Sequence, residues 1–205
     1  MNRLAMPAPA VSRFALCLAL GVLAGCGSGA RQPAAPPPLA GAAIGGPFEL
    51  TDKAGKTVRW SDFAGKYRIV YFGYTYCPDA CPTDVARMSQ GLSQFEKGEP
   101  ARGAKVQPIF ISVDPARDTP AKVGEFAANF HPRLIGLTGT PAQVAGAAKA
   151  FAVFYERAPG QPDGSYMVNH STVTYLFGPK GEPLATLPTD KGPAAVAAEL
   201  TRWVQ

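Results

Sequence analysis

Two cysteines, Cys77 and Cys81, stand four positions apart in the segment 74–82, which reads YTYCPDACP. A predicted strand precedes this segment and a predicted helix follows it. Backbone N–H groups at a helix start, together with the helix dipole, lower the pKa of a cysteine and favour its thiolate. The pair is therefore predicted to form a redox-active disulfide or to hold a soft metal, since thiolates select Cu(I) and also suit zinc. A structural disulfide is the alternative, but closing so short a loop would stabilise the fold little.

The chain contains only two histidines, and their surroundings indicate different roles. His131 precedes a proline, a position typical of a helix end, so we expect a structural role. His170 precedes a predicted strand at 172–177. If that strand runs antiparallel to the central parallel strands, its beginning lies beside their carboxyl ends, where the two cysteines emerge. A neutral imidazole there could join two thiolates around one metal. A hydrogen-bonded polar residue at a strand start would fit the pattern equally well.

Two methionines are further soft side chains. Met88 shares a helical spacing with Val85, Leu92 and Phe95, so we expect it in the core. Met167 lies close to His170 in the sequence, and the pattern does not decide between a ligand and a packing role.

Alternating strands and helices must position these side chains. Predicted strands lie at 48–50, 57–60, 68–74, 106–113, 134–137, 172–177 and 183–187. Predicted helices lie at 83–97, 121–130, 140–151 and 193–204. The first two strands and the last two strands are each joined by a turn sequence and are predicted to form hairpins. This order predicts an α/β fold over residues 48–205, a thioredoxin-like sandwich with an N-terminal hairpin and additional elements.

The residues before this domain differ from it in composition. Residues 1–25 are predicted to be a lipoprotein signal peptide, because two arginines precede a short apolar stretch that ends in small residues before Cys26. This arrangement resembles the lipobox of bacterial lipoproteins, so Cys26 is the predicted lipid attachment site and Cys17 belongs to the removed segment. Residues 26–47 are rich in Gly, Ala and Pro and are predicted to be a tether. We expect the mature protein at the periplasmic or extracytoplasmic face of a bacterial membrane, the inner membrane in preference to the outer.

Composition and charge exclude several other classes of protein. The chain has 205 residues, 46% of them hydrophobic, which excludes a fully disordered protein. Four cysteines are too few for a disulfide-dense scaffold. The formal net charge is +5, but acidic and basic residues are interspersed, so no nucleic-acid partner is expected.

Four segments together give the sequence a family resemblance. They are CPDACP at 77–82, VDPARDTP at 113–120, HPRLIGLTG at 131–139 and YMVNHS at 166–171. In this combination the chain resembles the SCO/SenC family from about Phe48 to the C-terminus. The resemblance implies a thioredoxin-like, membrane-tethered copper chaperone that delivers copper to the Cu(A) centre of cytochrome c oxidase subunit II, which would be its partner.

The resemblance also implies roles for single residues. Cys77, Cys81 and His170 would be the ligands of copper, as Cu(I) or Cu(II). The family often carries Asp immediately before the histidine, whereas this chain has Asn169. An amide keeps the capacity to form hydrogen bonds but removes a negative charge beside the metal, which could weaken Cu(II) binding.

The segment 113–120 contains three further polar residues of interest. The resemblance implies that Asp114 belongs to the surroundings of the site. For Arg117 and Asp118 we expect local roles only, namely a surface ion pair and a helix start.

Two enzyme classes are alternatives to a chaperone. A thiol-disulfide oxidoreductase, acting on cysteines of the oxidase subunit or of other extracytoplasmic proteins, would suit a cysteine pair at a helix start. Against it, the spacing is CxxxC rather than CxxC, and disulfide exchange does not need His170. A peroxiredoxin-like peroxidase is disfavoured because Val70 and Tyr74 stand where that family carries Pro and Thr.

Overall fold

Strand β3 (Tyr67–Gly73) lies at the centre of the fold, and all seven of its residues are buried. The computed structural model describes residues 35–160, 162 and 164–205. Within them, β3 belongs to a five-stranded sheet with the order β5-β4-β3-β8-β9. The other strands of this sheet are β4 (Val106–Ser112), β5 (Ile135–Leu137), β8 (Thr174–Phe177) and β9 (Pro183–Leu187). The first three strands in this order run parallel, whereas β8 is antiparallel to both β3 and β9.

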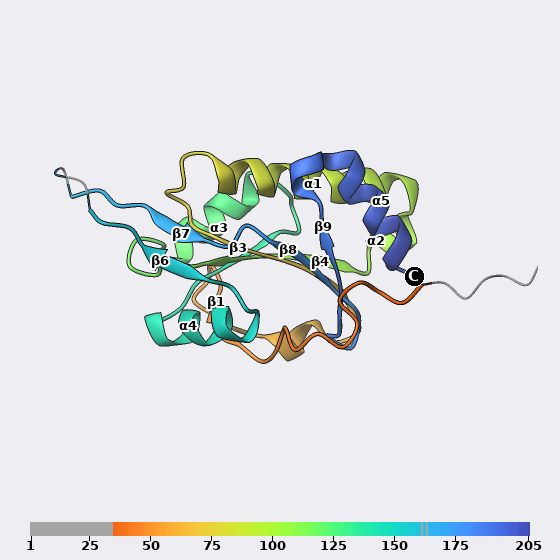
Figure 1. The fold of residues 1–205 in the computed structure, drawn as a ribbon, viewed down its shortest axis with the longest axis horizontal. Coiled ribbons are helices and arrows are strands. Elements are labelled where there is room, and N and C mark those ends of the chain that lie inside the picture. Colours follow the sequence, from red (N-terminus) through yellow and green to blue (C-terminus); the bar gives the residue numbers. More distant parts are fainter. Residues whose placement is uncertain (1–34, 161, 163) are drawn as a thin grey trace, which may run out of the picture. The chain divides into compact units, whose positions relative to one another are not determined.

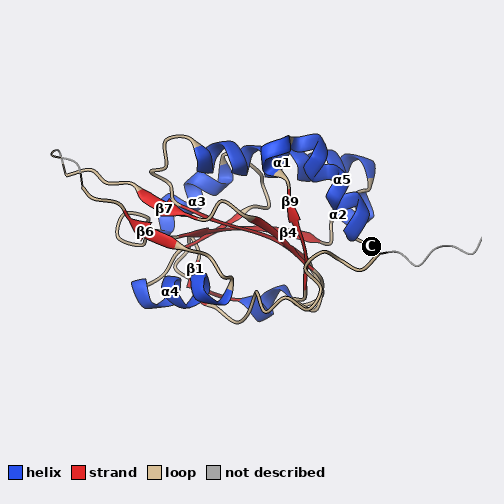
Figure 2. Cartoon of the chain, in the orientation of Figure 1, coloured by secondary structure: helices blue, strands red, loops and turns tan. Residues whose placement is uncertain are grey.

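Helices cover both faces of the sheet, which is why every residue of its central strand is buried (Figures 1 and 2). They are α1 (Ala80–Gly98), α2 (Pro100–Gly103), α3 (Pro120–Ala128), α4 (Pro141–Ala150) and α5 (Pro193–Trp203). Helices α1, α3 and α5 lie on one face and α4 on the other. Helices α1 and α3 share a face because each joins two parallel strands by a right-handed crossover in the same direction across the sheet. This arrangement is the predicted thioredoxin-like α/β sandwich.

Helix α1 carries the second cysteine. Its apolar face is buried as predicted, Met88 included. The helix begins at Ala80 rather than at the predicted residue 83, so Cys81 lies inside its first turn. The side chain of Asp79, the residue before the helix, makes no capping hydrogen bond. Instead, Sγ of Cys77 accepts the backbone N–H of Cys81 at 3.3 Å and so satisfies a donor at the helix start.

The predicted hairpins are both present. Strands β1 (Glu49–Thr51) and β2 (Thr57–Arg59) pair antiparallel, as do β8 and β9. The predicted cap of α4 is also confirmed, since the Thr140 hydroxyl accepts the N–H of Gln143 at 3.3 Å. The described residues also include short 3-10 turns at Trp60–Phe63 and Thr189–Lys191.

One further pair of strands is not predicted from the sequence. Strands β6 (Tyr155–Arg157) and β7 (Val168–His170) pair antiparallel and project from one end of the domain (Figure 1). Each is three residues long and β6 is largely exposed, so neither shows a hydrophobic alternation in the sequence. As a result His170 ends β7, rather than standing at the start of the strand that became β8.

The residues just before β1 lie against the domain. Leu39 and Ile44 pack against the core. The N–H of Leu39 donates to the carbonyl of Leu184 at 3.0 Å, and that of Gly45 to the carbonyl of Ala150 at 2.9 Å. Part of the stretch predicted to be a tether is therefore held by the folded unit.

The predicted signal peptide at 1–25, with Cys17, and the predicted lipid attachment site Cys26 lie outside the described residues. Among the residues that the structure does describe, no helix combines the length and the apolar character needed to cross a membrane.

Candidate metal centre

Both cysteines lie at the carboxyl end of β3, where the chain leaves the sheet. Both are free thiols; Cys81 is fully buried and Cys77 is half-buried in the loop before α1. Gly73, the last residue of β3, makes room for the buried thiol, because a Cβ built on it would lie 3.1 Å from Sγ of Cys81. The same Cβ would lie 2.9 Å from the ring of Tyr71 and 3.0 Å from that of Phe110, both fully buried. A side chain at position 73 would therefore displace the thiol or one of the rings.

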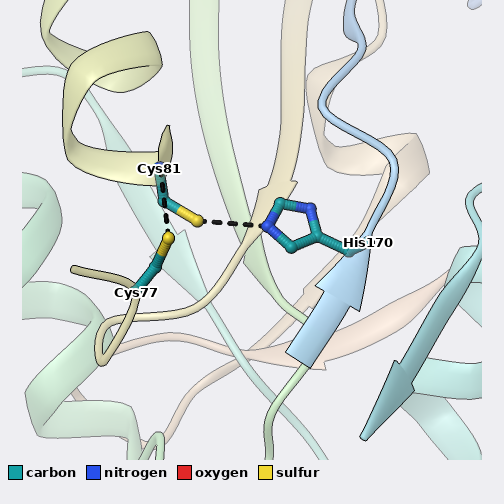
Figure 3. Close-up of side chains that lie close together, drawn as sticks. All are labelled: Cys77, Cys81 and His170. Atoms are coloured by element: carbon teal, nitrogen blue, oxygen red, sulfur yellow. Dashed lines mark hydrogen bonds between the residues drawn. The ribbon is translucent and has the colours of Figure 1, made fainter. Parts of the chain in front are cut away.

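The third donor comes from β7. Tyr71 of β3 pairs with Thr174 of β8, so the chain just before β8 lies beside the end of β3, as the predicted topology requires. There, Nε2 of His170 lies 3.2 Å from Sγ of Cys81 (Figure 3). The sulfurs of Cys77 and Cys81 and a ring nitrogen of His170 all lie within 4.8 Å of one another. The fold thus brings to the cysteine pair a histidine that lies 89 positions beyond Cys81 in the sequence.

Hydrogen bonding prepares the His170 ring for a metal. Its Nδ1 lies 2.9 Å from the carbonyl oxygen of Ser171. Because a carbonyl only accepts, Nδ1 carries the proton and Nε2, which faces Cys81, keeps a free lone pair. The rings of Tyr71 and Tyr74 stand edge-on to the imidazole, with centroids 6.3 Å and 5.8 Å away, and restrict its orientation.

Burial shifts the pKa values of two site residues. It raises the pKa of the Cys81 thiol, and the neighbouring Cys77 thiol raises it further. The prediction that the helix start lowers this pKa is therefore wrong for Cys81, because the loss of hydration outweighs the helix dipole. Burial also lowers the pKa of His170, so the imidazole is neutral at pH 7. A metal that binds here displaces the proton of Cys81, and no proton needs to leave Nε2.

The turn between β4 and α3 holds the cysteine loop. The buried carboxylate of Asp118 accepts the backbone N–H of Thr75 at 3.0 Å and the hydroxyls of Thr75 and Ser112. The helix start itself is capped by Thr119, which accepts the N–H of Lys122. The expectation that Asp118 only starts the helix is wrong, because its carboxylate links the loop before the cysteines to the end of β4.

The same turn also holds the segment that leads into β7. Nε of Arg117 donates to the Asp114 carboxylate at 2.5 Å, and Nη1 donates to the carbonyl of Tyr166 at 2.9 Å. The guanidinium lies 3.6 Å from the centre of the Tyr166 ring, whose hydroxyl donates to Asp114 at 2.8 Å. The expected surface ion pair is therefore wrong, since Arg117 and Asp114 are largely buried and bind the chain shortly before His170.

Two of the predicted residues lie away from the three donors. His131 is buried, with Nε2 3.3 Å from Glu96 and Nδ1 accepting the N–H of Arg133, so its structural role is confirmed. Asn169 is exposed, and alternation along β7 directs its side chain to the face opposite His170. The substitution of Asn for Asp therefore does not alter the face that meets the cysteines.

Sequence reasoning missed several side chains around the donors. Tyr71 and Tyr74 belong to a predicted buried strand, and nothing in the pattern indicates that their rings border His170. Gly73 carried a usable signal, because a glycine that ends a strand of large residues often marks a close approach. The aromatic residues carried none, since a core tyrosine and a site tyrosine look alike in a strand.

The donor set suits soft metal ions. Two sulfurs with one imidazole nitrogen are ligands that favour copper and also accommodate zinc. Cys81 lies at the closed side of the site and the half-buried Cys77 at the more accessible side. A fourth ligand from another molecule would therefore approach from the side of Cys77.

Comparisons with known proteins agree with this geometry. A family model described as SCO1/SenC matches residues 37–205. The chain is 46% identical over 159 residues to protein SenC of Rhodobacter capsulatus, which covers 77% of this chain and 69% of that protein. It is 43% identical over 144 residues to the mitochondrial protein SCO1 homolog 1 of Arabidopsis thaliana, covering 70% of this chain and 42% of that protein. It thus spans less than half the length of this plant relative.

Solved structures lead to the same family. The structure of Bradyrhizobium japonicum ScoI with copper bound superposes with a TM-score of 0.71 at 40% identity, over 79% of this chain and all of that one. Yeast Sco1 with copper bound gives a TM-score of 0.71 at 34% identity, over 78% of this chain and 88% of that one. Since the family model covers most of the chain and the fold, the motifs and the relatives agree, the protein belongs to the SCO1/SenC family.

Proposed function

We propose that this protein is a membrane-tethered copper chaperone that delivers copper to the Cu(A) centre of cytochrome c oxidase subunit II. The observation that carries the proposal is the convergence of Cys77, Cys81 and His170 within 4.8 Å. It is supported by the copper that is bound in the structures of related ScoI and Sco1 proteins. A protein related at 25% identity is described as a member of the Sco family of cytochrome c oxidase assembly proteins.

The three donors contribute differently to the binding of Cu(I) and of Cu(II). Cys77 and Cys81 bind Cu(I) as thiolates, and His170 contributes more to Cu(II), for which imidazole is a good ligand. Because Cys77 is half-buried, a ligand of the receiving protein can enter the coordination shell before a chaperone ligand leaves. Oxidation of the pair to a disulfide removes both thiolates, so copper loading depends on the redox state of the cysteines.

The proposed location rests on the sequence before the domain. A signal peptide at 1–25 would direct export and then be removed. A lipid on Cys26 and a Gly/Ala/Pro-rich tether would hold the domain at the extracytoplasmic face of a bacterial membrane. A flexible tether would let the metal site reach a membrane-bound oxidase subunit.

An anaerobic copper titration of the reduced chain tests the proposal. We expect one Cu(I) per chain, and we expect Cys77→Ser or Cys81→Ser to abolish tight binding because each removes a thiolate. His170→Ala should weaken Cu(II) binding more than Cu(I) binding. His131→Gln is the matched control, because His131 bonds to Glu96 and Arg133 away from the site, and it should bind copper normally.

Delivery is measured by mixing the copper-loaded chain with a copper-free soluble domain of subunit II. After separation of the two proteins, copper analysis should find the metal on the subunit II domain. The visible absorption of the mixed-valence Cu(A) centre should appear once two Cu(I) ions per domain have been transferred and an added mild oxidant has removed one electron. Full copper binding by Cys77→Ser would contradict the proposed site. Copper that stays on the chaperone would contradict the proposed delivery.

A thiol-disulfide oxidoreductase is a second candidate. It is favoured by the half-buried Cys77, whose sulfur accepts an N–H at the start of α1, with the buried Cys81 beside it as the resolving thiol. This activity requires that the metal-free reduced chain reduce a disulfide substrate, with the electrons supplied by oxidation of Cys77 and Cys81. No turnover by metal-free protein would exclude it.

A further inference from the structure

Met167 is a soft side chain that the three-donor site does not use. Of the two methionines in the described part of the chain, Met88 is fully buried in the core, whereas Met167 is 42% exposed. Met167 directly precedes β7, and its backbone carbonyl accepts the N–H of Ala158 across the ribbon. The backbone at this position is therefore held, while the long unbranched side chain is partly exposed to solvent.

The hydroxyl of Tyr74 connects Met167 to the site. It donates to Sδ of Met167 at 3.8 Å, and the ring of the same tyrosine stands edge-on to His170. Tyr74 thus contacts both the thioether of Met167 and the imidazole of the site.

The Tyr74 hydroxyl places the exposed thioether of Met167 beside the ring that borders His170. Cys81 is fully buried, so an ion reaches the donors past Cys77 and His170. A thioether is neutral and soft, so it binds Cu(I) without losing a proton and without changing the oxidation state of the metal. In the exchange one sulfur lone pair binds the ion as another ligand leaves.

We infer that Met167 is an entry and exit ligand, a thioether that holds Cu(I) briefly while the ion passes between the three-donor site and an external ligand. The inference rests on the proposed copper function of that site. A ligand bound only during passage stabilises the intermediate of exchange, so it speeds loading and unloading by the same factor. The equilibrium affinity for Cu(I) is then determined by the three donors alone and does not depend on Met167.

Stopped-flow transfer of Cu(I) from the loaded full chain to an excess of a chromogenic Cu(I) chelator tests this role. We expect Met167→Leu and Met167→Ala to release copper severalfold more slowly than the original chain. Loading from a weak Cu(I) complex should slow by the same factor, with an unchanged dissociation constant at equilibrium. Met88→Leu, a volume-conserving change in the core, is the matched control and should exchange copper at the original rate.

The two variants at position 167 distinguish a side chain that binds copper from one that only shields the site from solvent. A side chain that merely shields the site would let Met167→Ala release copper faster than the original chain, and that result would overturn the inference. Unchanged rates in both variants would overturn it as well, and so would a dissociation constant that rises with either variant. If the original chain itself bound no Cu(I), the proposed function would fail instead, so the two failures are distinguishable.

Discussion

At the scale of single residues, the buried thiol of Cys81 depends on the absence of a side chain at position 73. A Cβ at Gly73 would lie 3.1 Å from this thiol and about as close to two buried aromatic rings. The rings are packed on all sides, so the thiol has to yield at least part of the space. The buried thiol can therefore occupy its position only because Gly73, at the end of β3, has no Cβ.

Gly73→Ala should therefore weaken both the fold and the site. We expect a loss of about 1–3 kcal/mol in the free energy of unfolding, as for overpacked cores, together with a lower Cu(I) affinity because the Cys81 sulfur moves. Thermal unfolding and competition with a Cu(I) chelator measure the two effects. Gly146→Ala in α4 is the matched control, because a Cβ there meets nothing within 4 Å. Original stability and affinity in Gly73→Ala would show that the close approach does not constrain the thiol.

At the scale of elements, one turn positions both ligand-bearing segments. The residues between β4 and α3 reach the cysteine loop through Asp118 and the segment before β7 through Arg117 and Asp114. These contacts join parts of the chain that are far apart in sequence. Secondary contacts of this kind orient metal ligands and influence affinity without touching the metal.

Removing the Asp118 carboxylate should loosen the cysteine loop. Asp118→Ala leaves the Thr75 N–H without its partner, and we expect Cu(I) affinity to fall roughly 10- to 100-fold, as for other outer-shell residues of metal sites. Chelator competition measures the affinity and chemical denaturation the stability. Asp52→Ala is the control, because Asp52 also accepts two backbone N–H groups of a turn but lies in the β1–β2 hairpin. Equal copper affinities in the two variants would contradict a positioning role for Asp118.

At the scale of the whole molecule, the folded unit extends beyond the predicted start of the domain. Residues 35–205 form one compact unit, and the family model also begins before β1, at residue 37. Leu39 and Ile44 pack against the core, and a Cβ at Gly45 would touch the ring of Phe177. The stretch before β1 therefore contributes to the core and is not only a spacer.

A chain that begins at Phe48 should be less stable than one that begins at Ala35. Its loss of the Leu39 and Ile44 contacts is expected to lower the free energy of unfolding by roughly 1–3 kcal/mol, from the apolar area that becomes exposed. Urea unfolding of the two chains measures the difference. Copper affinity should be the same in both, because the stretch contacts Leu184 and Ala150 rather than the loops that carry the donors. Equal stabilities would show that the stretch is only a tether.

Local patterns in the sequence were sufficient to predict most of the elements. The apolar face of α1, the threonine cap of α4 and both hairpins depend on residues that are close in sequence, so spacing alone reveals them. The β6–β7 ribbon was missed because two short strands with little burial leave no alternation to detect. The same limitation placed His170 at the start of the wrong strand.

The sequence by itself determined the donor types, their attachment to a strand end and a helix start, and the resemblance to a copper-binding family. Only the tertiary structure decided that His170 meets Cys81, that burial raises the pKa of that thiol, and that Asp118 and Arg117 hold the two ligand-bearing segments. The physical reason is that burial and long-range hydrogen bonds depend on which distant segments pack together. The spacing of residues along the chain does not reveal that packing. Helix periodicity and capping depend on neighbouring residues, so they can be predicted from the sequence.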